Sequence, residues 1–250
     1  MSSAYALAAG VSRGEQARLL AEVRARAQAS GRSGAIVFDL DSTLFDNRPR
    51  QARILREFGA AHAVPALAAA SPEHWTSWSV TRAMTAAGLP LEEAKRLAPS
   101  ARTFWRERFF TSAYCVDDVL ITGARAYLGR LIESGARIVY LTGRWTEMER
   151  GTIACLAAEG APVPDGDRVH LYMKPTLEES DDEWKRRATR LVDDSLAGGR
   201  VLAAFDNEPA HLNIHHAAWP EALTIRLATD HSGREIPVAD GIPSIADFDE

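Results

Sequence analysis

Short apolar runs alternate with longer segments in which apolar residues recur at helical spacing. The runs at residues 35–38, 137–141, 169–173, 201–205 and 222–227 are nearly continuous in apolar side chains. Such runs are typical of strands that are covered on both faces, as in a parallel sheet. The alternation of strands and helices therefore predicts an α/β fold with a Rossmann-like, doubly wound parallel sheet.

One long helical segment interrupts this alternation after the first strand. Residues 47–117 show almost no strand pattern, so we expect a helical domain there and an α/β core made of residues 1–46 and 118–250. Expected helices within this segment are 50–62, Ser71 to Gly88, 91–98 and 100–110. It also holds a concentration of aromatic residues: Trp75, Trp78, Phe104, Trp105, Phe109 and Phe110. These rings either form a small helical core or line a substrate pocket.

Helices are expected in the core as well. Residues 13–30 form an amphipathic helix, and residues 118–134 form a helix that returns the chain to the sheet. Further helices are expected at 145–159, 180–195 and 209–217. The last 20 residues contain two prolines and several aspartates, so we expect them to lie on the surface.

The first strand ends in two carboxylates that are one residue apart. Asp39 and Asp41 follow the apolar run, and Ser42 and Thr43 then turn the chain away. Side chains two residues apart lie on the same face of a strand, so a loop at its end can aim both carboxylates at one point. Two anions this close repel each other unless one is protonated or a cation lies between them. The pair predicts a nucleophile, a proton donor and a divalent metal at the carboxyl end of a strand, where open α/β sheets bind ligands.

Polar residues also follow the second strand. Thr142-Gly143-Arg144 stands where we expect the strand to turn into a helix. The threonine hydroxyl and the free amides of a helix N-terminus suit an anion such as phosphate, although a simple helix cap has the same pattern.

Two lysines and one acidic segment complete the candidate chemistry. Lys174 comes directly after the third strand, whereas Lys185 lies in the first turns of the following helix. The fourth strand ends in Asp206-Asn207-Glu208. Hard divalent cations such as Mg²⁺ take oxygen ligands, so Asp39, Asp206 and the backbone carbonyl of Asp41 are candidates for the protein's share.

Composition excludes some classes of function. The net charge of −5 provides no basic field, so nucleic acid is an unlikely partner. No apolar run approaches the roughly 18 residues that span a membrane. Residues 4–11 are mildly apolar but short and without a basic start, so we expect no signal peptide. Cys115 and Cys155 make no disulfide or metal pattern, which predicts a cytoplasmic protein.

The segment Asp-Leu-Asp-Ser-Thr-Leu at 39–44 resembles the first motif of the haloacid dehalogenase-like (HAD) hydrolases, hydrophobic-hydrophobic-D-x-D-x-T-L/V. The Thr-Gly-Arg at 142–144 is similar to the second motif, a Ser or Thr after the second strand. The segment beginning at Asp206 resembles the fourth motif, except that Asn207 replaces the usual second acid. The helical segment lies where this family inserts its C1 cap.

The resemblance implies a role for each residue. Asp39 would attack phosphorus, and Asp41 would protonate the leaving oxygen and then activate water. The third motif is a lysine that neutralises nucleophile and phosphate; the family often places it at a helix start, which favours Lys185 over Lys174. Asn207 could ligate the metal or orient a bound water.

The resemblance implies a Mg²⁺-dependent phosphatase that hydrolyses a small phosphorylated metabolite through an aspartyl-phosphate. In it Thr142, Gly143 and Arg144 bind the phosphate. Four alternatives remain: a dehalogenase, against which Asp41 counts; a phosphotransferase or phosphomutase; a polynucleotide 3′-phosphatase; and a catalytically weak binding module. The sequence leaves the oligomeric state open.

Overall fold

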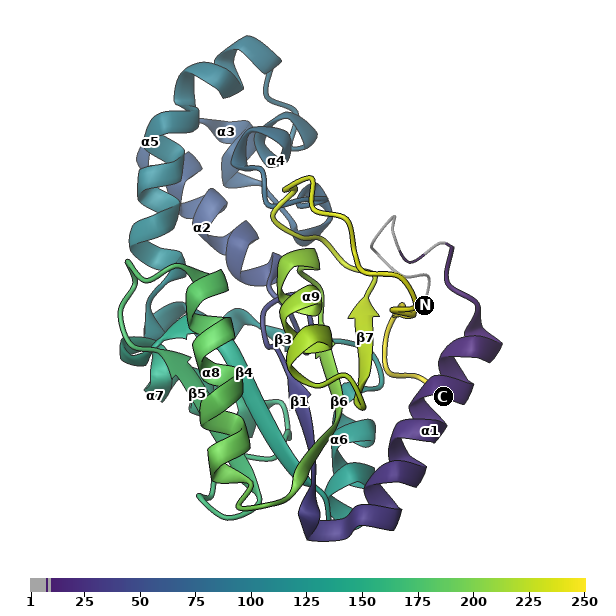
Figure 1. The fold of residues 1–250 in the computed structure, drawn as a ribbon. Helices are drawn as coiled ribbons and strands as arrows, with labels where there is room; N and C mark the ends of the chain where they lie inside the picture. The colour runs from purple at the N-terminus through teal and green to yellow at the C-terminus, as the bar shows by residue number, and fades with distance from the viewer. Residues whose placement is uncertain (1–7, 9) are drawn as a thin grey trace.

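Six parallel strands form one sheet in the order β5-β4-β1-β6-β7-β8. The computed structural model describes residues 8 and 10–250, so most of the segment 4–11 lies outside the described residues (Figure 1). The strands are β1 Gly34–Phe38, β4 Arg137–Trp145, β5 Val169–Lys174, β6 Arg200–Asp206, β7 Leu223–Leu227 and β8 Ser244–Ile245. The chain runs outward from β1 to β5, then crosses back to β6 and runs outward again. This confirms the predicted α/β, doubly wound sheet.

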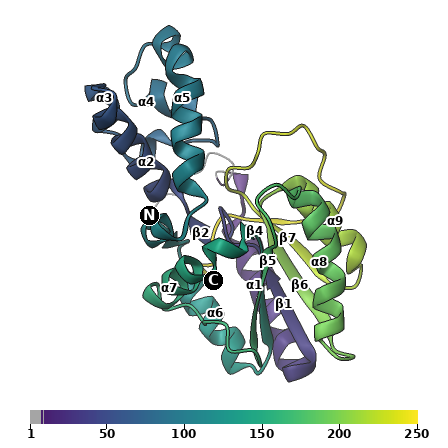
Figure 2. The same cartoon turned by 90° about the vertical axis from the view of Figure 1, so that its left-hand side faces the viewer.

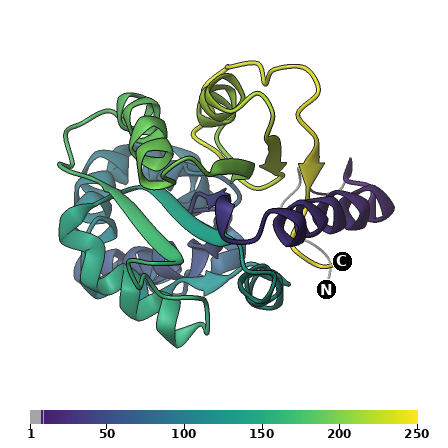
Figure 3. The ribbon, with the colours of Figure 1, turned by 60° about the horizontal axis from the view of Figure 1, so that its bottom comes forward.

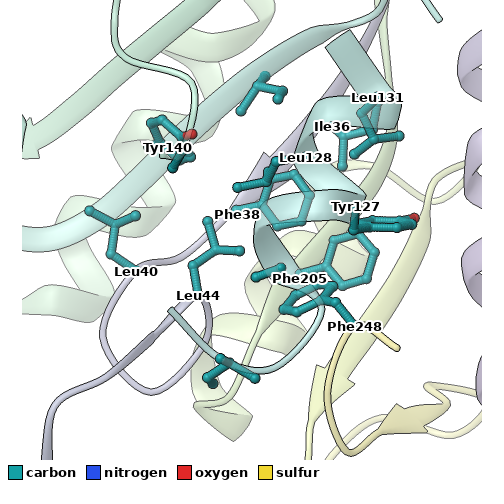
Figure 4. Close-up of a cluster of buried hydrophobic side chains, with 14 of the residues drawn as sticks. Ile36, Phe38, Leu40, Leu44, Tyr127, Leu128, Leu131, Tyr140, Phe205 and Phe248 are labelled. Carbon is teal, nitrogen blue, oxygen red and sulfur yellow. The ribbon is translucent and has the colours of Figure 1, made fainter. Parts of the chain in front are cut away.

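Helices cover both faces of the sheet (Figures 2 and 3). One face packs against α1 Arg13–Ser30, α6 Ala124–Glu133 and α7 Glu149–Ala158, and the other against α8 Asp181–Ser195 and α9 Pro209–Ala218. Side chains alternate along a strand, so Ile36 and Phe38 enter the first layer while Ala35 and Val37 enter the second. Figure 4 shows the first layer, where Phe38 stacks on Phe205 with ring centroids 4.8 Å apart.

A helical bundle rises above the carboxyl ends of the strands (Figure 2). The chain enters it through β2 Phe45–Asp46 and leaves it through β3 Val119–Leu120, and these two strands pair antiparallel. Its helices are α2 Arg48–Ala61, α3 Pro65–Ala68, α4 Val80–Ala86 and α5 Leu91–Phe109, followed by a 3₁₀ segment, Ser112–Asp117. Phe58, Trp75 and Met84 belong to a hydrophobic cluster of its own, separate from the clusters on the sheet.

Three expected helices in this bundle are wrong in their bounds. Ser71 begins only a 3₁₀ turn, Pro72–His74, and the helix after it starts at Val80. Further on, α5 is one helix that runs through Pro99. Proline removes one backbone donor, but the buried stripe of Ala94, Ala98 and Ala101 continues across it, so packing outweighs the lost hydrogen bond.

The core differs from expectation at three places. Residues 118–123 are not helical, because Ile121 N–H donates to the Leu44 carbonyl and extends the β2–β3 pairing. Strand β4 continues to Trp145, so Thr142 does not stand at a helix N-terminus. The last 20 residues do not simply lie on the surface: they contribute β8, and Phe248 is fully buried against Phe205 and Tyr127.

Candidate active site

A tight loop sets the two carboxylates at the end of β1. Asp39 N–H donates to the Phe205 carbonyl at 2.9 Å, which continues the pairing of β1 with β6. The Leu40 carbonyl then accepts from the backbone N–H groups of Leu44 and Phe45. Ser42 adopts a positive φ of 59° and is held by hydrogen bonds to the Phe45 carbonyl and the Asn47 amide oxygen. The chain therefore turns within a few residues.

Lys185 joins the ends of three strands. Its Nζ donates to Asp39 Oδ1 at 2.7 Å, to Asp206 Oδ2 at 2.9 Å and to the Leu141 carbonyl at 2.7 Å. The side chain is fully buried, and burial opposes its charged form. The carboxylates of Asp206 and Asp39 nevertheless raise the pKa of Lys185 above its usual value. Lys185 is therefore a fixed cation between two carboxylates.

Lys174 lies elsewhere. Its Nζ donates to Asp181 Oδ1 at 2.6 Å and to the Leu177 carbonyl at 3.3 Å. Of the two rival lysines, the structure brings only Lys185 to Asp39.

Burial and the neighbouring charges have opposing effects on the ionisation of Asp39. Burial is the main cause that raises the pKa of Asp39 to about 7; Lys185 opposes this, and the nearby carboxylates of Asp206 and Asp41 add to it. For Asp206, burial is outweighed by Lys185 and His211, so its pKa lies well below the usual value. We name the group of Asp39, Asp41, Lys185 and Asp206 the charged floor.

Asp41 is held by two arginines. Arg144 donates to both of its oxygens at 2.8 and 2.9 Å, and Arg50, on α2, donates to Oδ1 at 2.6 Å. Both arginines also pair with the fully buried Asp118, at 2.6 and 3.0 Å. Although burial opposes ionisation, Arg144 and Arg50 lower the pKa of Asp41 to about 2. Asp41 is therefore an anion tied to the helical bundle.

The remaining predicted site residues lie near this floor, and each makes its own set of contacts. Thr142 is buried, and its Oγ1 accepts the Arg144 backbone N–H at 3.1 Å. Gly143 lines the pocket, and a Cβ there would lie 3.2 Å from the Asp181 carboxyl group. Arg144 directs its guanidinium to Asp41 and Asp118 and donates to Thr152, so most of its donors are already engaged. Asn207 Oδ1 accepts from the Thr43 hydroxyl at 3.1 Å.

Sequence reasoning missed several contributors. One of them is Arg50, which is fully buried. Ile54 and Phe58 follow it at four and eight residues, so the sequence places a charged residue on the apolar face of a helix, and that was the signal that could have found it. His211 and His215 are two further contributors, because the structure brings both to Asp206. His215 Nε2 lies 3.3 Å from Asp206 Oδ2, and His211 Nδ1 lies 3.6 Å from Oδ1. Their spacing along α9 puts them on one side of that helix.

A divalent cation fits the donors at the floor. Within residues 8 and 10–250, no three His, Cys, Asp or Glu side chains are placed to hold a metal ion. The candidate set instead combines the carboxylates of Asp39 and Asp206 with the amide oxygen of Asn207 and the Asp41 backbone carbonyl. All are oxygen donors, which hard cations such as Mg²⁺ prefer while keeping several waters. A cation there would also favour the ionised form of Asp39, which burial disfavours.

A pocket of about 490 Å³ opens above the floor. Asp39, Asp41 and Asn207 line its bottom. Four rings from the helical bundle form one side, which we name the aromatic wall: Trp78, Trp105, Phe109 and Phe110. A second group of lining residues comes from α8, α9 and the chain after β7, and we name it the polar rim: Asp181, Asp182, Glu208, His211, Ser232 and Arg234.

Comparisons with known proteins concern the fold. No protein-family model matches the sequence, and no curated protein matches it. Protein Tyrosine Kinase A of Mycobacterium tuberculosis has a similar structure, with a TM-score of 0.51 and 15% identity over 85% of this chain and 93% of that chain. CbbY of Rhodobacter sphaeroides, solved with phosphate, has a TM-score of 0.48 and 18% identity over 86% and 94%. The haloacid dehalogenase-like family protein SP0104 of Streptococcus pneumoniae has a TM-score of 0.48 and 12% identity over 86% and 94%.

No described helix is long and apolar enough to cross a membrane. The sheet is the α/β, doubly wound parallel sheet that the sequence predicts. The protein therefore has an α/β fold similar to that of Protein Tyrosine Kinase A.

Proposed function

We propose that the protein is a Mg²⁺-dependent phosphatase that hydrolyses a small phosphorylated metabolite through an aspartyl-phosphate on Asp39. The observation that carries this proposal is the contact of Lys185 with both Asp39 and Asp206 beneath an open pocket. Among the described residues, only Oδ1 of Asp39 receives a hydrogen bond, which leaves the other oxygen to attack phosphorus. The helical bundle is the proposed cap, with residues 47–117 as its bounds.

In the first step Asp39 displaces the alcohol and takes the phosphoryl group. Lys185 keeps its proton and neutralises negative charge on Asp39 and the transferring group. The Thr142 hydroxyl accepts one hydrogen bond in the structure, so its own proton can be donated to a phosphoryl oxygen. A bound Mg²⁺, held by Asp39, Asp206 and the Asp41 carbonyl with Asn207 nearby, would polarise the phosphoryl oxygens.

Asp41 is the proposed acid and base. Its two arginines favour the ionised form, which suits the second step, where a carboxylate takes a proton from the attacking water. For the first step Asp41 must carry a proton, so it has to leave at least one arginine. Arg50 belongs to α2, and movement of the cap would break that contact.

We also propose which lysine acts at the phosphate site and in which compartment the protein is found. Lys185 takes the phosphate-site role, because Lys174 pairs with Asp181 instead. The two buried, free cysteines support the expectation of a reducing cytoplasm.

The test is release of phosphate from a generic aryl phosphate with Mg²⁺, with EDTA, and with Asp39→Asn. We expect turnover that requires the metal and falls at least a thousandfold in the variant. Asp247→Asn is a matched control, because that aspartate is equally buried but bonds to Arg13 and Gln16 of α1. Equal turnover in Asp39→Asn and wild type would remove Asp39 as nucleophile and refute the mechanism.

A further inference from the structure

The aromatic wall is a continuous surface of rings. Trp105 stacks on Phe109 with centroids 4.4 Å apart, and Trp78 meets Trp105 edge-on at 6.2 Å. Phe110 meets Phe109 edge-on at 5.2 Å. Each ring is fixed by a neighbour, so the wall keeps its shape.

These rings are not simply the core of the bundle. The bundle has its own cluster around Phe58, Trp75 and Met84, all fully or almost fully buried. Trp78 and Trp105 are only half-buried and line the pocket, and Trp105 also packs against the edge of that cluster. Exposed rings that line a cavity beside reactive groups are available to a ligand.

The wall is also tied to the charged floor. The guanidinium of Arg50 lies 3.7 Å above the ring of Phe109 and donates to the Phe109 carbonyl, while its other end holds Asp41. For a molecule whose phosphate meets Asp39, these rings are the apolar surface that the same pocket offers to the remainder.

The polar rim offers no free positive charge to that remainder. Arg234 donates to both oxygens of Asp182 at 2.7 and 2.9 Å and to Glu208 at 3.1 Å. The other cations among the described lining residues are also engaged: Arg144 pairs with Asp41 and Asp118, and His211 contacts Asp182 and Asp206. Asp181 pairs with Lys174. The rim therefore has no unpaired cation that would offset the desolvation of a second anionic group on the substrate.

We propose that the substrate is a phosphomonoester whose alcohol carries a flat, uncharged aromatic ring, and that this ring stacks on Trp78 and Trp105. This inference rests on the proposed phosphatase function and names its substrate class. The reaction is hydrolysis: the P–O bond to the alcohol breaks, a water oxygen bonds to phosphorus, and the alcohol and inorganic phosphate leave.

The test compares two substrates with the same kind of leaving group. Benzyl phosphate and cyclohexylmethyl phosphate both release a primary alcohol, so they differ in the flat ring and not in the chemistry. We expect kcat/KM to favour benzyl phosphate about tenfold, the size of one good ring contact. A para-carboxylate on the benzyl ring should remove most of this advantage.

Variants locate the effect on the wall. Trp105→Leu and Trp78→Leu should bring the ratio close to one by lowering kcat/KM for benzyl phosphate alone. Phe104→Leu is the matched control, because Phe104 lies on the same helix but packs on Phe58 and does not line the pocket. It should leave the ratio unchanged.

The outcomes separate the two proposals. A ratio near one in the wild type, with phosphate release that depends on Asp39, overturns the aromatic substrate and keeps the phosphatase. If neither ester is hydrolysed, calorimetry measures the binding of benzylphosphonate and cyclohexylmethylphosphonate in the presence of Mg²⁺. About tenfold tighter binding of the benzyl compound, lost in Trp105→Leu, supports the inference. Equal or undetectable binding of both compounds overturns it. The phosphatase proposal is judged separately, by Asp39→Asn.

Discussion

The charged floor and the aromatic wall line one pocket, but they are built in different ways. The floor takes two aspartates from the loop after β1, Lys185 from α8 and Asp206 from β6, and each of these charged groups pairs with an opposite charge. The wall comes from one local stretch, residues 78–110, whose rings pack on one another. Sheet topology brings the carboxylates of the floor together and α8 adds Lys185, whereas the wall depends on how one bundle packs. Substitutions at Trp78 and Trp105, which do not contact the floor's charged groups, therefore test the choice of substrate apart from the chemistry.

The largest expected effect comes from removing the cation of the charged floor. Lys185→Met leaves Asp39 and Asp206 facing each other without a buried cation, and losing one partner of a buried pair costs about 3–5 kcal/mol. Phosphatase activity should fall at least a hundredfold. Lys174→Met is the control: its partner Asp181 is exposed, so we expect a cost of about 1 kcal/mol or less. Urea unfolding and phosphate release measure both, and a larger activity loss in Lys174→Met would reverse the assignment of the two lysines.

A second prediction separates the bundle that carries the wall from the core that carries the floor. Met84→Ala removes a fully buried side chain from the bundle's own cluster and should cost about 2–5 kcal/mol. If the bundle is a separate domain, hydrogen exchange should accelerate in α4 and α5 and stay unchanged in β1 and β6. Leu128→Ala, in the sheet's cluster, is the reciprocal change. Acceleration throughout the chain by Met84→Ala would show a single cooperative unit.

A third prediction concerns a carboxyl group just behind the floor. Burial raises the pKa of Asp230 to about 6. Between about pH 4 and 6 this carboxyl group is therefore more often protonated in the native state than in the unfolded chain. Its contribution to the free energy of unfolding falls as the pH rises through this range, by up to about 3 kcal/mol. Asp230→Asn should be more stable relative to wild type at pH 7 than at pH 4. Urea unfolding of both proteins at the two pH values measures this, and a difference independent of pH would contradict the burial argument.

The smallest expected effect is on the polar rim. Arg234→Gln removes the two ion pairs of a half-exposed arginine, with Asp182 and Glu208, so stability should change by about 1 kcal/mol or less. The rim becomes more negative, and we expect about a two- to fivefold gain in kcat/KM for 4-(aminomethyl)benzyl phosphate relative to benzyl phosphate at low ionic strength. Arg187→Gln, an exposed pair with Glu179 outside the pocket, is the control. An unchanged ratio would mean that the rim does not contact the substrate.

Local patterns located the elements better than their ends. The expected strand at 137–141 exists, but it continues to Trp145, because pairing with β5 extends past the apolar run and Lys174 meets Trp145. Thr142 therefore lies inside a strand rather than at a helix start. The C-terminal residues were expected on the surface from their prolines and aspartates. Ile245 and Phe248 are buried there because α1, α6 and β7 leave apolar surface that they cover.

Contacts across the chain lay beyond sequence patterns. Arg144 was expected to bind phosphate, and the fold instead engages it with Asp41 and Asp118. Arg50, which binds the same two carboxylates, lies 94 residues away along the chain, on α2. Periodicity reports which face of a helix is buried, and it does not report which charge from a distant segment will meet that face.

By itself, the sequence determined the order of strands and helices and the position of Asp39, Asp41 and Asp206 at strand ends, because apolar runs and their interruptions are local properties of the chain. The tertiary structure decided that Lys185 and not Lys174 reaches Asp39, and that His211 and His215 flank Asp206. It also decided that four rings of the bundle face the floor. These are distances between segments far apart in sequence, and they follow from how the layers pack.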